Sequence, residues 1–229
     1  MENCNSEMLN RAMRNAGTTN GFDEVQAEFS AFRDFKIRWT RSYRWISLEV
    51  SDYLRNAPEN VIRSLAETVF AKIRGDDAAA YSAEVCEYLN SQEFLDGNQG
   101  LYLKRYRGIS RFSRGENVDL QVSYRRLVEK GLVENDQRLV IRWSGSEDRG
   151  RKVGRSCVLM RTIVMNPALD SEDVSEEEID YALYSQICHV NLGLGPSREN
   201  DTERYEAMLE RYPERMQAVT ELRRQGFSL

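Results

Sequence analysis

The chain has 229 residues, enough for one substantial domain or two small ones around a hydrophobic core. Its formal net charge of −5 is too small to indicate nucleic-acid or membrane binding by itself. No run of about 18 apolar residues is present, and the polar N-terminus lacks the apolar stretch of a secretion signal. The four cysteines are widely separated, which argues against a thiolate zinc ribbon. We therefore expect a cytoplasmic protein without a membrane span.

Residues 1–27 are rich in polar side chains, and we expect them to form a mobile arm. A region of strands and helices then covers residues 28–116. Apolar and polar residues alternate at 35–39 and 45–50, a pattern that predicts a β-hairpin. Two alternatives are open for its basic residues, which could form an ordinary solvated face or a surface for an acidic partner. These residues are Arg33, Lys36, Arg38, Arg41 and Arg44.

A helix is predicted to start at Pro58 and to end at Gly75. Asp76 or Asp77 is the expected cap of the next helix. Residues 96–100 contain two glycines among polar residues and predict a loop.

Residues 101–116 mix aromatic and basic side chains, which is the combination used to stack bases and neutralise phosphates. The same mixture is common on ordinary protein surfaces, so nucleic-acid binding is one alternative among several. The candidate nucleic-acid contacts, including two from a later loop, are Lys104, Arg105, Arg107, Arg111, Arg151 and Lys152.

The second predicted region covers residues 117–229, although residues 28–229 could equally form one continuous domain. Asn117 is the expected cap of a helix that ends near Gly131. Strands are predicted at 138–143, 156–160 and 161–166. Helices follow to the end of the chain, and no internal repeat is visible. This order of elements predicts an α+β protein.

The clearest predicted helix runs from Ser175 towards Pro196. Ser175 followed three residues later by Glu178 forms a capping-box pattern. Glycines at 193 and 195 end the helix. An apolar stripe at helical spacing predicts one buried face, and it consists of Ile179, Leu183, Ile187, Val190 and Leu194. The only histidine of the chain, His189, lies on a flanking stripe.

This succession of elements resembles the SprT-like and YgjP-like zinc metallopeptidases, which have a zincin fold. The resemblance is carried by strands that end in Asn166-Pro167, by the helix ending in His189-Val-Asn-Leu-Gly193, and by the later stretch Leu209-Glu-Arg-Tyr-Pro213. It implies a mixed sheet packed against a central site helix. In that family the helix carries His-Glu-x-x-His, and a third histidine ligand follows downstream.

Placed on the family motif, Ser185 occupies the position of the first histidine and Gln186 that of the glutamate. His189 is the retained second histidine, and Asp201 lies at or near the third ligand position. Residues four apart share a helix face, so two histidines there can hold one zinc ion. Serine is a poor zinc ligand, and glutamine cannot act as a general base. The resemblance therefore implies a degenerate site, with no tightly held cofactor expected and weak zinc binding as the alternative.

Several readings of this site are open. His189 could be a core histidine with no ligand. A contact between Ser185 and His189 is geometrically allowed, since they are one turn apart. The leading hypothesis is a catalytically inactive peptidase-like protein that binds a protein or peptide in its cleft. The alternatives are a metal-dependent hydrolase that uses His189 and carboxylates, and a nucleic-acid-binding accessory protein.

Overall fold

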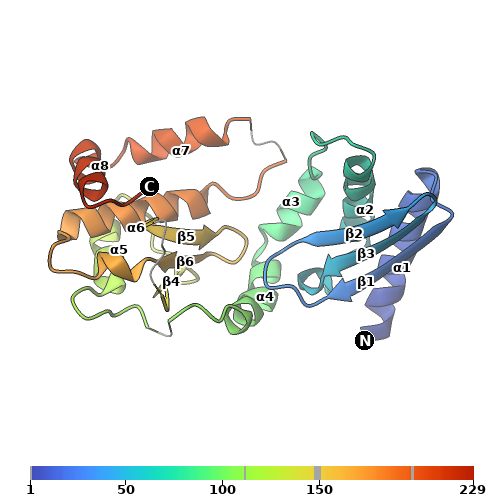
Figure 1. Cartoon of the computed structure of the whole chain (residues 1–229), viewed down its shortest axis with the longest axis horizontal. Coiled ribbons are helices and arrows are strands. Elements are labelled where there is room, and N and C mark those ends of the chain that lie inside the picture. Colours follow the sequence, from blue (N-terminus) through green and yellow to red (C-terminus); the bar gives the residue numbers. More distant parts are fainter. Residues whose placement is uncertain (1, 111, 147–150, 197–198) are drawn as a thin grey trace. The chain divides into compact units, whose positions relative to one another are not determined.

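The structure is a computed structural model that describes residues 2–110, 112–146, 151–196 and 199–229, with side chains from Ser6 onward. Over these residues the chain is an α+β protein with eight α-helices and two three-stranded mixed sheets (Figure 1). It divides into two compact units. The first comprises residues 1–105 and 194–197, and the second comprises residues 106–193 and 198–229. None of the described helices is both long and apolar enough to cross a bilayer.

The first unit begins with α1 (Glu2–Thr19) and the strands β1 (Glu24–Ser30), β2 (Ile37–Ser42) and β3 (Trp45–Ser51). A short 3-10 helix (Asp52–Leu54) leads to α2 (Glu59–Ile73), α3 (Ala83–Leu89) and α4 (Gln92–Arg105). The central strand β3 pairs in parallel with β1 and antiparallel with β2. The hairpin of β2 and β3 confirms the prediction from alternation.

The second unit contains α5 (Leu120–Glu129) and the strands β4 (Val140–Trp143), β5 (Gly154–Cys157) and β6 (Thr162–Met165). Another 3-10 helix (Pro167–Leu169) precedes α6 (Glu176–Asn191), α7 (Asp201–Leu209) and α8 (Arg215–Arg224). The central strand β6 pairs in parallel with β4 and antiparallel with β5, so β5 is an edge strand.

The two units have the same order of elements, which the sequence does not reveal. Each consists of a helix, three strands in the order first-third-second, a 3-10 helix and three further helices. The spacing is also conserved, because the second strands begin at residues 37 and 154 and the following long helices at residues 59 and 176, both 117 residues apart. The expectation of no internal repeat is therefore wrong at the level of structure.

Residues 1–27 do not form the mobile arm that their polar composition predicts. They form α1 and the start of β1, and Leu9 and Met13 of α1 are fully buried. The side chain of Asn10 accepts a hydrogen bond from the amide of Ala27 at 3.1 Å, which joins the helix to the strand. Burial of these apolar side chains therefore stabilises α1 although its polar sequence has only a weak tendency to form a helix.

The prediction of a loop at residues 96–100 is also wrong, because these residues lie inside α4. Phe94, Leu95 and Tyr102 of this helix are buried, and the amide of Asn98 donates to the carbonyl of Tyr53 at 3.1 Å. Two helix caps lie a few residues from their predicted positions. Ser82 rather than Asp76 or Asp77 caps α3, and Asp119 rather than Asn117 caps α5.

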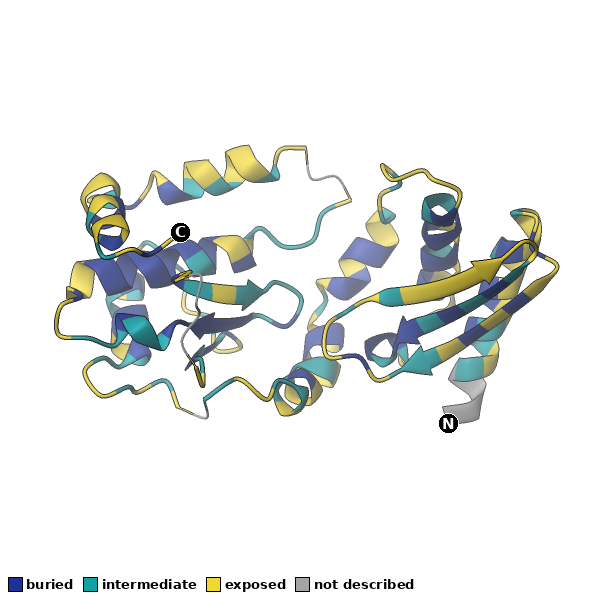
Figure 2. Cartoon of the chain, in the orientation of Figure 1, coloured by how far each residue is buried: buried dark blue, intermediate teal, exposed yellow. Residues whose placement is uncertain are grey.

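Helix α6 is the centre of the second unit, where it contacts α5, α7, α8, β5 and β6. Figure 2 shows most of its length as buried. The predicted stripe of Ile179, Leu183, Ile187 and Val190 is buried, and the neighbouring residues Tyr181, Tyr184 and Cys188 are buried as well. Residues on nearly all sides of α6 are buried, so the helix lies within the core of the second unit. Any site on α6 is therefore restricted to the part that reaches solvent.

Candidate functional site beside helix α6

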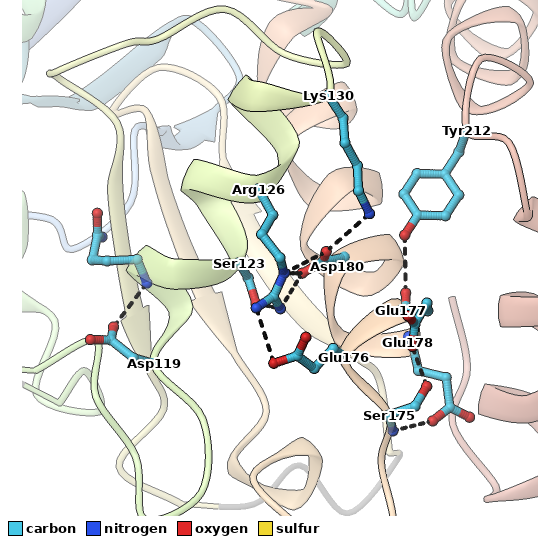
Figure 3. Close-up of polar contacts among 11 residues, drawn as sticks. Asp119, Ser123, Arg126, Lys130, Ser175, Glu176, Glu177, Glu178, Asp180 and Tyr212 are labelled. Atoms are coloured by element: carbon cyan, nitrogen blue, oxygen red, sulfur yellow. Dashed lines mark hydrogen bonds and ion pairs between the residues drawn. The ribbon is translucent and has the colours of Figure 1, made fainter.

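The N-terminus of α6 is fixed by the predicted capping box. The Ser175 hydroxyl accepts from the amide of Glu178 at 3.3 Å, and the Glu178 carboxylate accepts from the amide of Ser175 at 2.5 Å (Figure 3). Glu178 also accepts from the side chain of Gln225, which follows α8. At the other end, Gly193 has a φ of 71°, a left-handed conformation that suits glycine and ends the helix.

An ion pair joins α6 to α5. The guanidinium of Arg126 contacts the Asp180 carboxylate at two points, and Glu176 and Lys130 lie further out (Figure 3). The Asp180 side chain is only 2% exposed. Hydrogen bonding to Asp180 raises the pKa of Arg126, so the guanidinium stays protonated. These contacts fix the position of α6, and with it that of the motif residues.

The motif positions 185 and 189 lie on one continuous helix but in different environments. Ser185 is buried, and its hydroxyl donates to the carbonyl of Ala182 at 2.8 Å. Gln186 is half-buried, whereas His189 is exposed. The interpretation of His189 as a core histidine is therefore wrong. The contact considered between Ser185 and His189 is not made by the Ser185 hydroxyl, which is directed to the helix backbone.

A pocket of about 420 Å³ opens beside His189 at the C-terminal end of α6. Asp201 lines the same pocket, so the structure brings together two of the residues that the resemblance selects. The ring of Tyr205 meets the imidazole edge-on, with the ring centroids 6.2 Å apart. Burial raises the pKa of Tyr205 to about 12, so its hydroxyl is neutral at physiological pH. The remaining lining residues are Val158, Leu192, Gly193 and Thr202.

Ser156 is a site residue that the sequence did not identify. It lies on β5, and its Oγ is 2.7 Å from Nδ1 of His189 on α6. The two residues are 33 positions apart, and a serine in a short strand carries no pattern that predicts such a contact. The interaction arises because β5 packs against α6 in the folded unit.

The residues of this pocket do not fit a zinc site of the family type. Ser185 is directed into the helix, so the pocket offers one imidazole and the Asp201 carboxylate. Catalytic zinc usually has three protein ligands. Across the described ranges, no three histidine, cysteine, aspartate or glutamate side chains are grouped so that they could hold a metal ion.

The basic residues considered for nucleic-acid binding are divided between the two units. Arg105 contacts the Asp52 carboxylate at two points, 2.7 and 2.6 Å, and is therefore engaged within the first unit. The guanidinium of Arg151 lies 4.7 Å from the ring centre of Phe227. Lys104 belongs to the first unit, Arg107 and Lys152 belong to the second, and all three are exposed. Arg111 lies outside the described residues.

The basic residues of the hairpin are mostly engaged by nearby groups. Arg38 contacts Glu49 at 3.3 Å, and Arg44 contacts Asp23 at 2.8 Å. Arg41 donates to the carbonyl of Ile73 at 2.8 Å. Because residues 38 and 41 are an odd number apart on one strand, they lie on opposite faces of the sheet. The single basic face suggested by the sequence is therefore not formed.

Comparison of the chain with protein-family models, with curated proteins and with solved structures finds no match. The function must therefore be argued from the site itself.

Proposed function

We propose that this protein is a catalytically inactive relative of the SprT-like and YgjP-like metallopeptidases that binds a protein or peptide segment. The binding site is the pocket formed by His189, Asp201, Thr202 and Tyr205. One observation carries the proposal. Ser185, which occupies the first ligand position, is buried, and its hydroxyl donates to a carbonyl of the helix backbone. His189 therefore supplies the single imidazole at the pocket.

The edge strand β5 supports a peptide as the bound group. Among the strands that the structure describes, β5 pairs with β6 alone, and its Ser156 contacts His189 beside the pocket. An extended peptide can add to such an edge through backbone hydrogen bonds, while a neighbouring pocket selects a side chain. A mixed sheet packed against the site helix is also the arrangement that the resemblance implies.

The metal content of the purified native chain tests the first half of the proposal. We expect clearly less than one zinc per chain by elemental analysis, and no cleavage of unfolded substrates such as casein. The physical reason is that one imidazole and one carboxylate form too small a ligand set for catalytic zinc. One tightly bound zinc per chain would overturn the proposal.

Peptide binding tests the second half. Peptides selected on the full chain from a displayed random library should bind at least 10-fold more weakly to Thr202→Arg, in which the exposed residue 202 fills the pocket mouth. Glu221→Ala, a substitution on α8 outside the pocket lining, serves as the matched control and should bind as the native chain does. Equal affinities for the two variants would place the peptide elsewhere.

A metal-dependent hydrolase is the alternative, favoured by the fact that His189 and Asp201 line one pocket. Metal-dependent cleavage that is lost in His189→Ala would establish this alternative in place of the binding module.

A further inference from the structure

We propose that Ser156 and His189 form a nucleophile–base pair that accepts acyl groups from small activated esters. This reactivity needs neither zinc nor a bound peptide, and it is separate from the peptidase activity that the proposed function excludes. It uses a serine on β5 that has no counterpart in the peptidase motif. The class of substrate is an ester with a good leaving group, small enough to reach Ser156 beside the pocket of about 420 Å³ that His189 lines.

Ser156 and His189 have the geometry of a nucleophile–base pair. The distance of 2.7 Å between Ser156 Oγ and His189 Nδ1 lies within the range of nucleophile–base hydrogen bonds. One residue lies on a strand and the other on a helix, and β5 and α6 pack against each other. Groups on such elements are held more precisely than groups on loops. His189 is exposed and Ser156 is half-buried, so a small reagent can reach both.

His189 lies in the last turn of α6, and Asp201 and Thr202, from the first turn of α7, line the same pocket. The charged side chains of this turn of α7 are Asp201, Glu203 and Arg204, and Asp201 contacts Arg204 at 3.7 Å. The positive end of α7 therefore offsets part of the negative charge of the two carboxylates.

The step with p-nitrophenyl acetate is as follows. Ser156 Oγ forms a bond to the acetyl carbon while its proton passes to Nδ1 of His189. The bond from the acetyl carbon to the phenolic oxygen breaks, and p-nitrophenolate leaves with the electron pair. The imidazolium releases its proton to solvent. The product is an acetyl ester on Ser156. Water then forms a bond to the acetyl carbon while one of its protons passes to Nδ1 of His189, and the bond from the acetyl carbon to Ser156 Oγ breaks. Oγ takes that proton back from the imidazolium, and acetate is released.

The first measurement is the tautomer of His189, which is accessible because the chain has a single histidine. Long-range ¹H–¹⁵N spectra of the full chain at neutral pH should show the proton on Nε2, with Nδ1 accepting from Ser156. In Ser156→Ala this preference should be lost. A proton on Nδ1 in the native chain would overturn the proposal, because Nδ1 would then be unable to take the serine proton.

The second measurement is acylation of the full chain by p-nitrophenyl acetate, mapped by tandem mass spectrometry. We expect acetyl on Ser156, formed about 100-fold more slowly in His189→Gln. Ser185→Ala is the matched control, since it removes a buried hydroxyl that is bonded to the helix backbone, and it should react like the native chain. Thermal unfolding shows which variants are folded. Acetylation of Ser156 at the same rate in folded His189→Gln, or no acetyl on Ser156 at all, would overturn the proposal.

Discussion

Arg126 and Asp180 join α5 to α6 through three hydrogen bonds. Nε of Arg126 donates to Oδ1 at 3.2 Å and to Oδ2 at 2.9 Å, and Nη2 donates to Oδ1 at 2.7 Å. The carboxylate is almost fully buried, whereas the guanidinium is 23% exposed. Removal of one member of a buried pair leaves the other charge without compensation, which costs more than the pair contributes. The ion pair therefore holds α6 against α5, and the buried Asp180 carboxylate needs Arg126 as its partner.

Asp180→Ala should lower the free energy of unfolding by about 3 kcal/mol, because it strands the Arg126 guanidinium between the two helices. Urea denaturation measures this change. Glu221→Ala removes a partner from an exposed pair with Arg224 and should change the stability by less than about 0.5 kcal/mol. Similar losses in the two variants would contradict the importance assigned to the buried pair.

Cys188 should make stability depend on alkaline pH. Burial raises the pKa of its thiol from 9.0 to about 11, and the side chain is 1% exposed. A group whose pKa is higher in the folded state stabilises that state below its unfolded pKa, and this contribution is lost as the pH rises through the folded value. The thiol of Cys188 should therefore contribute a fall of about 2 kcal/mol in the free energy of unfolding between pH 9 and pH 11.

Urea denaturation of Cys188→Ala isolates this effect, because the variant should lack that part of the pH dependence. Tyr205 also has a raised pKa, of about 12, so its contribution is lost at higher pH and remains in both proteins. A pH dependence that is identical with and without the thiol would show that Cys188 is not responsible.

Asp170 should control the order of the segment that precedes α5. Its carboxylate accepts from the amides of Glu116, Asn117 and Val118 at 2.6, 2.8 and 2.8 Å. Asp170→Ala removes all three charge-assisted bonds, so amide hydrogen exchange at residues 116–118 should accelerate at least 10-fold. Mass spectrometry of exchanged peptides measures this.

Asp173→Ala is the control for that experiment, since residue 173 is an exposed aspartate three positions after Asp170. Its exchange at residues 116–118 should match that of the native chain. A second variant, Gly115→Ala, should reproduce the effect of Asp170→Ala, because an added Cβ would lie 2.0 Å from the Asp170 carboxylate. Unchanged exchange in both test variants would rule out this role.

The sequence predicts α6 well because its boundaries are encoded locally. A serine and a glutamate three residues apart fix the start, and Gly193 fixes the end, so neighbouring residues suffice to predict the helix. Helix α1 lacks such features, since its stability depends on the burial of Leu9 and Met13 against residues distant in the sequence. Long-range packing of this kind is not visible in a local pattern.

The site was only partly predictable for the same reason. The resemblance selects His189 and Asp201, and these two residues do line one pocket. The contact of Ser156 with His189 depends on how β5 packs on α6, and it joins a common residue type to a histidine 33 positions away. The orientation of the Ser185 hydroxyl towards Ala182 likewise required coordinates.

Because corresponding elements of the two units are 117 residues apart, each site residue can be compared with the residue at the same place in the first unit. The positions 117 residues before Ser156 and His189 hold Trp39 on β2 and Lys72 on α2, in elements with the same place in the order. Neither can act as a serine or an imidazole. The amine of Lys72 reacts with activated esters without a paired base, so acetyl on Lys72 reports how much reagent the sample received and not the activity of a serine–imidazole pair.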